Sequence, residues 1–561
     1  MIEQPHVAEH DEHPAPRSML RYASQGPTTG SHDREAGERT PTDPPRFQPA
    51  LAALAETIRV LDAEGIRFCS WKSNRHLDAG LSGRTDVDLL VDAEQATAFR
   101  RVLRRSCLLQ LVQPADRRVP GIEHYLGFDP ASGRLFHLHV HLHVIVGSRG
   151  RKDRRIPVES AFLGTTERLH GVPVPAPAVE LAVLTIRGAL KYRPRDVVKD
   201  TLGIRSFGID GQILTEIEWL LGRTTIDEAC RVVREAGNLV PPDALETFLT
   251  LAKTGRRDGL AALRVRRRVS RALPRLPVGP APSPRTGIGG ALARAPRRMT
   301  PARGGRTIAL VGADGAGKTT HAAEITRWLA WKIDARLCYL GSKTSGPLAG
   351  ATYATFRGFR RLHRTSSERR WPSSVVDPAA WLRDVALACH HLATGYGRSR
   401  RYERAVRVAR AGGVVILDRF PLASLDGSPA ARLMDGPKIE ATLGPRRGLV
   451  RWLASREEQI YRRFRPPDEL LALDVDPSVA AARKPDHDAR LLDAKARAVT
   501  ELVRAGTVGA TVVRRIDANA PADVVLGRLK GEVWRALAPT PHDPADAPQE
   551  RAGAVRSPPS P

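Results

Sequence analysis

Hydrophobic residues follow two different periods along the second half of this 561-residue chain. Short apolar runs have the length of strands, and the segments between them repeat apolar residues every three or four positions, as one face of a helix does. The strand-length runs span 306–311, 414–417, 469–473 and 510–516. Strands that alternate with helices predict an α/β domain, a parallel sheet flanked by helices, over residues 306–540.

The block from residue 49 to 255 has a different pattern. Apolar and polar residues alternate at 135–146, as in a strand with one polar face. Residues 166–255 instead carry helical spacing, for example at 178–190. We therefore expect an α+β domain at 49–165, followed by a helical extension at 166–255.

Three segments have no hydrophobic period. Residues 1–48 and 541–561 are rich in proline and polar residues, so we expect both ends to be disordered. Residues 256–305 carry arginine clusters at 264–268 and 294–298 among proline and glycine. We expect this stretch to be a basic linker between the two ordered blocks.

Length and composition narrow the class of protein. A chain of 561 residues with 42% hydrophobic content can fill two or three domain cores. No apolar run approaches the roughly 20 residues that a bilayer helix needs, and the polar start is unlike a secretory signal. The five cysteines are far apart and form no CxxC pair. We therefore expect a cytoplasmic protein with free thiols and no membrane partner.

The formal net charge of +27 suggests nucleic acid as a partner, because clustered arginine and lysine neutralise phosphates. Yet only about a dozen of the 88 basic residues are lysine, and alanine, glycine and proline are also abundant. A GC-rich coding sequence produces this composition by itself. Nucleic acid therefore stays an alternative that the charge does not favour.

The strongest chemical signal is a glycine-rich loop at 312–319, which lies between the apolar run at 306–311 and a helical pattern at 320–331. Its glycines let backbone N–H groups turn toward phosphates, Lys318 can reach the β- and γ-phosphates, and the Thr319 hydroxyl can bind Mg²⁺. The loop predicts a site for ATP or another NTP. The residues expected to contact the nucleotide are Gly312, Ala313, Asp314, Gly315, Ala316, Gly317, Lys318, Thr319 and Thr320.

Two further segments can complete this site. Asp418 and Arg419 follow the apolar run at 414–417, at the carboxyl edge of the predicted sheet, where ligands bind in such folds. Asp418 could hold Mg²⁺ and Arg419 could bind a phosphate. The polar segment 483–488 could close over the phosphates as a lid, with an ordinary charged loop as the alternative.

These features together resemble the thymidylate kinase family. The shared order is Gly-x-Asp-Gly-Ala-Gly-Lys-Thr-Thr at 312–320, Asp-Arg-Phe at 418–420, Pro-Asp at 467–468 and Asp-Pro at 476–477. The match spans nearly the whole C-terminal half. It implies a P-loop kinase that uses Mg²⁺ and transfers the γ-phosphoryl group of ATP to a nucleoside monophosphate, dTMP by default.

The resemblance also implies roles for single residues. Asp314 would face the acceptor's sugar, and the turn 517–521 would lie near adenine. Lys318, Asp418, Arg419 and Arg483 would be the catalytic residues, with Arg419 on the acceptor phosphate and Arg483 in the lid; Thr319 and Asp418 would hold the metal.

The acceptor side departs from the family pattern. Residues 339–343 read Tyr-Leu-Gly-Ser-Lys where the family usually has Arg-Glu-Pro-Gly-Gly. Residues 424–427 read Ser-Leu-Asp-Gly where the family usually has Ala-Tyr-Gln-Gly. The long span 347–410, with Trp371 and Trp381, matches no motif of the family. These departures leave the acceptor open between dTMP, another nucleotide and a small phosphorylated metabolite.

The N-terminal block resembles the nucleotidyltransferase fold. Asp86 and Asp88 stand two apart in a predicted strand, so both point to one face and could share metal ions that bind a triphosphate. The Gly-Ser of that fold is missing, with Lys72-Ser73 nearest to its place, and a third acid is not evident. The strand expected to carry that acid instead has histidines at 137, 139, 141 and 143, which could bind a transition metal or phosphate, or simply be hydrogen-bonded.

The main interpretation is therefore a thymidylate kinase-like enzyme joined to a nucleotidyltransferase-like domain. Two alternatives stay open: metal-dependent nucleotidyl transfer by Asp86 and Asp88, and a nucleic-acid-binding protein that uses NTP as a switch. The partner expected is a nucleotide or a small phosphorylated substrate, and the sequence does not decide between a monomer and a homodimer.

Overall fold

The computed structural model describes residues 50–147, 152–202, 211–255, 258–276, 298–341, 346–422 and 435–538. The segments expected to be disordered, 1–48 and 541–561, lie outside the described residues. Within those ranges, no helix combines the length and the apolar character needed to cross a membrane.

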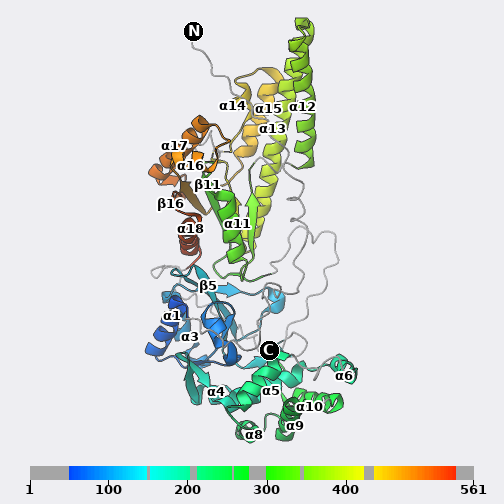
Figure 1. Ribbon diagram of the computed structural model, residues 1–561, viewed down its shortest axis with the longest axis vertical. Helices are drawn as coiled ribbons and strands as arrows, with labels where there is room; N and C mark the ends of the chain where they lie inside the picture. Colours follow the sequence, from blue (N-terminus) through cyan, green and yellow to red (C-terminus); the bar gives the residue numbers. More distant parts are fainter. Residues whose placement is uncertain are drawn as a thin grey trace, which may run out of the picture. The chain divides into compact units, whose positions relative to one another are not determined.

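A six-stranded mixed sheet forms the centre of the N-terminal part (Figure 1). Its order is β1-β2-β5-β4-β3-β10, with β2 and β5 parallel and the other neighbours antiparallel. The parallel register places Asp86 beside His137 and Asp88 beside His139. The strands are β1 (Phe68–Ser70), β2 (Asp86–Val91), β3 (Leu109–Val112), β4 (Ile122–Asp129), β5 (Arg134–His141) and β10 (Thr300–Pro301).

Apolar residues of this sheet pack against α1 (Ala52–Ala63) and α3 (Ala96–Arg105), which supply Leu54, Leu61 and Phe99 to the core. Short strands and a short helix follow. They are β6 (Ile145–Val146), β7 (Arg154–Arg155), α4 (Glu159–Gly164), β8 (Thr166–Leu169) and β9 (Val172–Pro175).

The helical extension is built around α5 (Pro177–Lys191), which is buried along most of its length. Its apolar residues share one core with the helices that follow and with Trp71 of the sheet domain. These helices are α6 (Pro194–Thr201), α7 (Gly211–Leu221), α8 (Ile226–Glu235), α9 (Pro242–Thr254) and α10 (Gly259–Ala272).

Helix α10 corrects the predicted linker at 256–305. Ala262, Val265 and Val269 lie on one face of the helix and are buried in the core of the extension, whereas the arginines of the 264–268 cluster lie mostly on the exposed face. The high arginine content predicted a linker, although the segment forms an amphipathic helix. The end of the predicted linker is also ordered, because β10 pairs with β3; residues 277–297 lie outside the described part of the chain.

The C-terminal part has a second six-stranded sheet, in the order β12-β13-β11-β14-β16-β15. All neighbours are parallel except β15 and β16, which confirms the predicted parallel sheet. The strands are β11 (Arg306–Gly312), β12 (Ala335–Tyr339), β13 (Val414–Asp418), β14 (Glu469–Asp474), β15 (Thr507–Val508) and β16 (Thr511–Asp517). The nearly continuous apolar sequences of β11, β13 and β14 are buried because helices cover both faces of these central strands.

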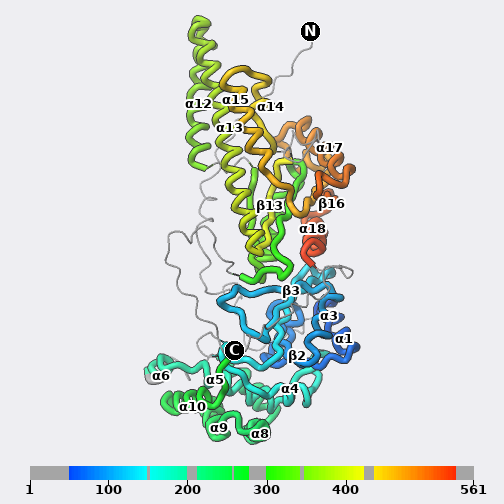
Figure 2. Tube along the Cα trace, turned by 180° about the vertical axis from the view of Figure 1, so that it is seen from behind, coloured from blue at the N-terminus to red at the C-terminus, as the bar shows by residue number. Residues whose placement is uncertain are grey.

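The span 347–410, which matched no motif, forms two long helices that run side by side, α12 and α13 (Figures 1 and 2). Helix α13 continues past this hairpin and packs on the sheet next to β13. The helices of this part are α11 (Lys318–Leu329), α12 (Pro347–Glu368), α13 (Ser373–Arg410), α14 (Ile439–Leu443), α15 (Gly448–Tyr461), α16 (Pro477–Arg483), α17 (Ala489–Ala505) and α18 (Ala522–Leu537).

Candidate nucleotide-binding site

The glycine-rich loop joins the end of β11 to the start of α11, as the sequence predicts. Gly315 and Gly317 have φ values of +89° and +82°, a left-handed region that side chains rarely adopt. A Cβ atom on Gly315 would also lie 2.8 Å from the carbonyl oxygen of Ala480. The turn therefore requires glycine at these positions, and it leaves the first N–H groups of α11 available to an anion.

Lys318 is the first residue of α11, and its side chain is only 6% exposed. Its Nζ donates to the carbonyl oxygens of Gly312 at 2.9 Å and Ala313 at 2.7 Å. Burial, with a further contribution from Arg419, lowers the pKa of Lys318 to about 8. The ammonium group is thus held inside the loop by contacts that a phosphate can replace.

Asp418 ends β13 and is completely buried. Neither carboxylate oxygen has a hydrogen-bond partner among the described residues. Burial raises the pKa of Asp418, and the Thr319 hydroxyl and the charges of Arg419 and Lys318 partly offset this. A buried carboxylate whose neighbours only partly offset its burial is costly, and a cation bound by oxygen ligands would remove that cost. Asp418 and Thr319 therefore fit Mg²⁺, which prefers oxygen ligands.

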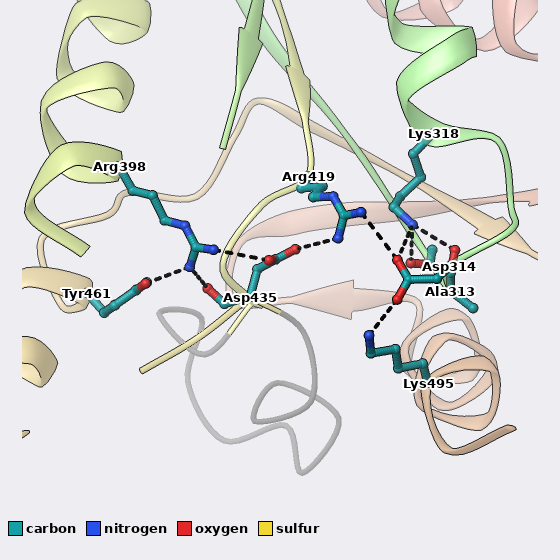
Figure 3. Close-up of polar contacts among 9 residues, drawn as sticks. Ala313, Asp314, Lys318, Arg398, Arg419, Asp435, Tyr461 and Lys495 are labelled. Carbon is teal, nitrogen blue, oxygen red and sulfur yellow. Dashed lines mark hydrogen bonds and ion pairs between the residues drawn. The ribbon is translucent and has the colours of Figure 1, made fainter. Parts of the chain in front are cut away.

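Asp314 is the centre of a charge network beside the glycine loop (Figure 3). Its carboxylate accepts a hydrogen bond from Nζ of Lys495 at 2.6 Å and from the Arg419 guanidinium at 3.3 Å, and it lies 3.9 Å from Nζ of Lys318. Although burial acts in the opposite direction, these cations hold the pKa of Asp314 well below its usual range. Three cations converge on one carboxylate, so the site carries excess positive charge.

Arg419 has a left-handed backbone, with φ of 72°, which is uncommon for a residue other than glycine. Besides Asp314, its guanidinium contacts the carboxylate of Asp435 at 3.4 Å. Asp435 also pairs with Arg398, whose side chain is only 1% exposed and donates to the Tyr461 hydroxyl at 2.7 Å (Figure 3). The unusual turn thus places Arg419 between two carboxylates.

Sequence reasoning missed Lys495, Arg398 and Asp435. Lys495 lies on α17 and Arg398 in the middle of α13, and neither belongs to a motif. Only the packing of these helices against the end of the sheet brings them to Asp314 and Arg419.

Arg483, the predicted lid residue, is the last residue of α16. Its guanidinium donates to the carbonyl oxygens of Ala518 at 2.9 Å, Asn519 at 3.3 Å and Ala520 at 3.2 Å. These carbonyls belong to the turn 517–521, which was expected near adenine. The structure therefore brings the predicted lid arginine and the predicted adenine turn together.

The two acceptor segments give less information. Residues 342–345 and 423–434 lie outside the described residues, and they include Lys343 and the 424–427 stretch. The structure therefore does not test the departures from the family pattern that the sequence shows in these two segments.

Both acids of the N-terminal pair are already neutralised by cationic or hydrogen-bonding groups. Asp86 Oδ1 lies 3.0 Å from Nδ1 of His137 and 2.5 Å from Nζ of Lys332. Asp88 Oδ1 lies 2.7 Å from Nδ1 of His139 and 2.8 Å from Nζ of Lys72. Metal ions shared by these acids would have to displace two lysines, so the arrangement does not favour the predicted metal role of Asp86 and Asp88.

The predicted histidine row is only partly a row. His137, His139 and His141 lie on β5, but His143 lies beyond its end, with Nδ1 3.4 Å from Glu159. Sequence reasoning missed His124 of β4, whose ring stacks on His137 and His139 at centroid distances of 5.3 and 4.8 Å. Of the predicted row, His137 and His139 are therefore the partners of Asp86 and Asp88, whereas His143 pairs with Glu159.

Comparison with known proteins gives close relatives by sequence. No protein-family model matches the chain. The chain is 30% identical over 238 residues to the "Uncharacterized ATP-binding protein YghR" of Escherichia coli, which covers 40% of this chain and 86% of that protein. It is 26% identical over 231 residues to the "Uncharacterized ATP-binding protein YghS" of Escherichia coli, covering 39% of this chain and 89% of that protein.

Among solved structures, two of deoxyadenosine kinase from M. mycoides, with bound dCTP and with bound dATP, match 40% of this chain and 98% of their own. Their sequence identities are 12% and 13%, and their TM-scores are 0.25 and 0.26. Scores this low carry no argument about the present chain.

Proposed function

The chain belongs to the family of the ATP-binding protein YghR, and from this premise we propose that it is an ATP- and Mg²⁺-dependent kinase. The phosphoryl acceptor proposed first is a nucleoside monophosphate, with dTMP as the default from the resemblance to thymidylate kinases. A small phosphorylated metabolite is the alternative, because the acceptor segments depart from that family.

The observation that carries this proposal is the pairing of the glycine loop with a buried, unpartnered carboxylate. Loop N–H groups and Lys318 would bind the β- and γ-phosphates, and Asp418 with Thr319 would hold Mg²⁺. The bound ion would neutralise charge on the phosphates as the γ-phosphoryl group leaves.

The charge network explains how an acceptor phosphate can be held. In the described structure Asp314 neutralises Arg419 and Lys495. An acceptor that brings its own phosphate gives these cations a further anionic partner in a partly buried site, where charge-assisted hydrogen bonds are strong. Arg419 is therefore proposed to orient the acceptor phosphate, and Arg483 to move with the adenine turn when the segment 483–488 closes.

The N-terminal acid pair is not proposed to transfer nucleotides, since Lys72, Lys332 and two histidines already pair with it. The nucleic-acid alternative stays open, because the first arginine cluster lies mostly on the exposed face of α10.

The test is ADP formation by the purified protein with Mg²⁺-ATP and a panel of nucleoside monophosphates. Lys318→Ala should lower the rate at least a hundredfold, since it removes the charge nearest the transferred group. Lys253→Ala, which changes an exposed lysine of α9, is the matched control and should leave the rate unchanged. Turnover of no monophosphate would refute the nucleotide acceptor, and ADP formation that survives Lys318→Ala would refute the site.

A further inference from the structure

A second group of basic side chains lies in the N-terminal domain, apart from the glycine loop. Lys72 follows β1, Lys152 precedes β7, and Arg187 lies on α5. All three surround the β5 histidines or the adjacent Trp71. The P-loop chemistry uses none of them.

The hydrogen bonds fix the direction in which each group donates. His139 donates from Nδ1 to Asp88 at 2.7 Å, so its Nε2 has no proton and accepts from Nζ of Lys152 at 2.9 Å. The same ammonium group lies 3.4 Å from Nε2 of His141. Lys72 contacts the other side of this group, at 2.8 Å from Asp88. Lys72 therefore pairs with Asp88 directly, and Lys152 reaches the same carboxylate only through the His139 ring.

The like charges are held close together at a cost. Burial, followed by the charges of Lys72 and Arg187, lowers the pKa of Lys152 to about 7, although the carboxylates of Asp88 and Asp86 act in the opposite direction. An anion that binds among the three basic side chains would relieve their mutual repulsion.

Arg187 is the third basic side chain of this group, and it lies over the Trp71 ring. Its guanidinium lies 5.6 Å from the centroid of the buried Trp71 ring, and Lys72 Nζ lies 5.1 Å from the same centroid. Within the described ranges of the chain, Arg187 forms no hydrogen bond and no ion pair, although it is half-buried. A half-buried guanidinium whose five donors have no acceptor can bind an oxyanion in forked geometry.

The residues around Lys72 are fixed by a buried contact rather than by a mobile loop. The Asn74 amide donates from Nδ2 to Glu180 at 2.9 Å and to the carbonyl oxygen of Ser70 at 2.9 Å, and its backbone N–H donates to Glu180. Asn74 and Glu180 are both buried. Glu180 lies seven residues before Arg187 on α5, so one helix both holds the turn and presents the guanidinium.

We propose that Lys72, Lys152 and Arg187 form a binding site for the phosphate group of a small molecule. The site takes a phosphate ester or a phosphoanhydride directly on its basic side chains. It goes beyond the kinase function proposed above and does not depend on the glycine loop.

A transition metal is the competing ligand, because ligand atoms of Asp88, His139 and His141 lie within 4.8 Å of one another. The contacts argue against it. Lys72 already contacts the Asp88 carboxylate, and Lys152 contacts the Nε2 atoms of His139 and His141. A divalent cation would therefore have to displace two ammonium groups and then remain close to their positive charges. Phosphate instead adds the negative charge that the group lacks.

The test uses the full chain with Lys318→Ala, which disables the glycine loop, and pyrophosphate as the probe in isothermal titration calorimetry. One pyrophosphate should still bind. Added Arg187→Met or Lys152→Met should weaken binding at least tenfold, and Arg187→Lys should weaken it less. Arg267→Ala, an exposed arginine of α10, should have no effect.

Absence of pyrophosphate binding in the Lys318→Ala chain would overturn the proposal, as would binding that Arg187→Met and Lys152→Met leave intact. Circular dichroism of each variant confirms that it is folded. Zn²⁺ that binds the Lys318→Ala chain through His139 and His141 and excludes pyrophosphate would also overturn it. The kinase proposal is measured with intact Lys318, so either proposal can fail without the other.

Discussion

Glu180 connects the stability of the helical extension to pH, and Glu180→Gln should remove that connection. Burial raises the pKa of Glu180 to about 7, and the nearby Glu216 raises it further, while the hydrogen bonds from Asn74 act in the opposite direction. The ordinary value is 4.5. Between these two values the folded protein holds a proton on Glu180 that the unfolded chain has released.

The sign follows from proton binding. Because the folded state binds more protons in this interval, the free energy of unfolding is highest below pH 4.5 and falls as pH rises toward 7. A shift from 4.5 to about 7, at about 1.4 kcal/mol per unit, corresponds to about 3 kcal/mol. Most of this change falls between about pH 5 and about pH 8.

The measurement is urea denaturation, followed by circular dichroism, of the wild-type chain and Glu180→Gln at pH 5, 6, 7 and 8. Glutamine does not titrate but has one acceptor oxygen fewer for Asn74, so it adds a pH-independent loss of about 1 kcal/mol. As pH rises, the free energy of unfolding should therefore fall more for the wild-type chain than for Glu180→Gln. Glu218→Gln, an exposed glutamate on α7, is the control and should follow the wild-type profile. Parallel profiles for wild type and Glu180→Gln would refute the reasoning.

Two further predictions concern the charge network and α10. Asp314→Asn leaves Arg419 and Lys495 without their shared carboxylate, so it should destabilise the nucleotide-free protein by about 3 kcal/mol. It should also increase the thermal stabilisation given by Mg²⁺-ATP. An unchanged melting temperature without nucleotide would contradict this prediction. Val265→Ala should cost about 2 kcal/mol, because its side chain is buried in the core of the helical extension, whereas exposed Arg267→Ala should change stability by less than about 0.5 kcal/mol. Equal effects in urea denaturation would mean that α10 does not pack as described.

Local patterns predicted the elements whose residues are neighbours in sequence. The glycine loop needs left-handed φ values within a few residues, so its sequence alone identified the turn from β11 to Lys318. The apolar run at 414–417 likewise predicted a buried strand that ends in Asp418. Such features depend on backbone geometry and on the periodicity of apolar side chains, and both can be deduced from residues that are neighbours in the sequence.

One prediction failed because composition and hydrophobic period gave different answers. Arginine density at 264–268 indicated a linker, yet the buried apolar positions Ala262, Val265 and Val269 of α10 repeat at helical spacing, and burial of that face outweighs the exposed charges. The acid pair at 86 and 88 indicated a metal site, and that role stays a prediction. Its partners on β5 and at Lys72 come from segments whose pairing the sequence does not reveal.

The sequence by itself therefore determined the phosphate loop, the parallel sheet and the carboxylate at its edge, since each follows from short-range geometry. Only the tertiary structure decided which charges meet. Asp314 accepts a hydrogen bond from Lys495 of α17, and Asp88 contacts His139 of a neighbouring strand. The packing of apolar faces sets both distances, and the pattern of apolar residues does not predict which charged side chains come to lie beside those faces. The free guanidinium of Arg187 above Trp71 belongs to the same class, since helix α5 reaches that ring only through the folded core.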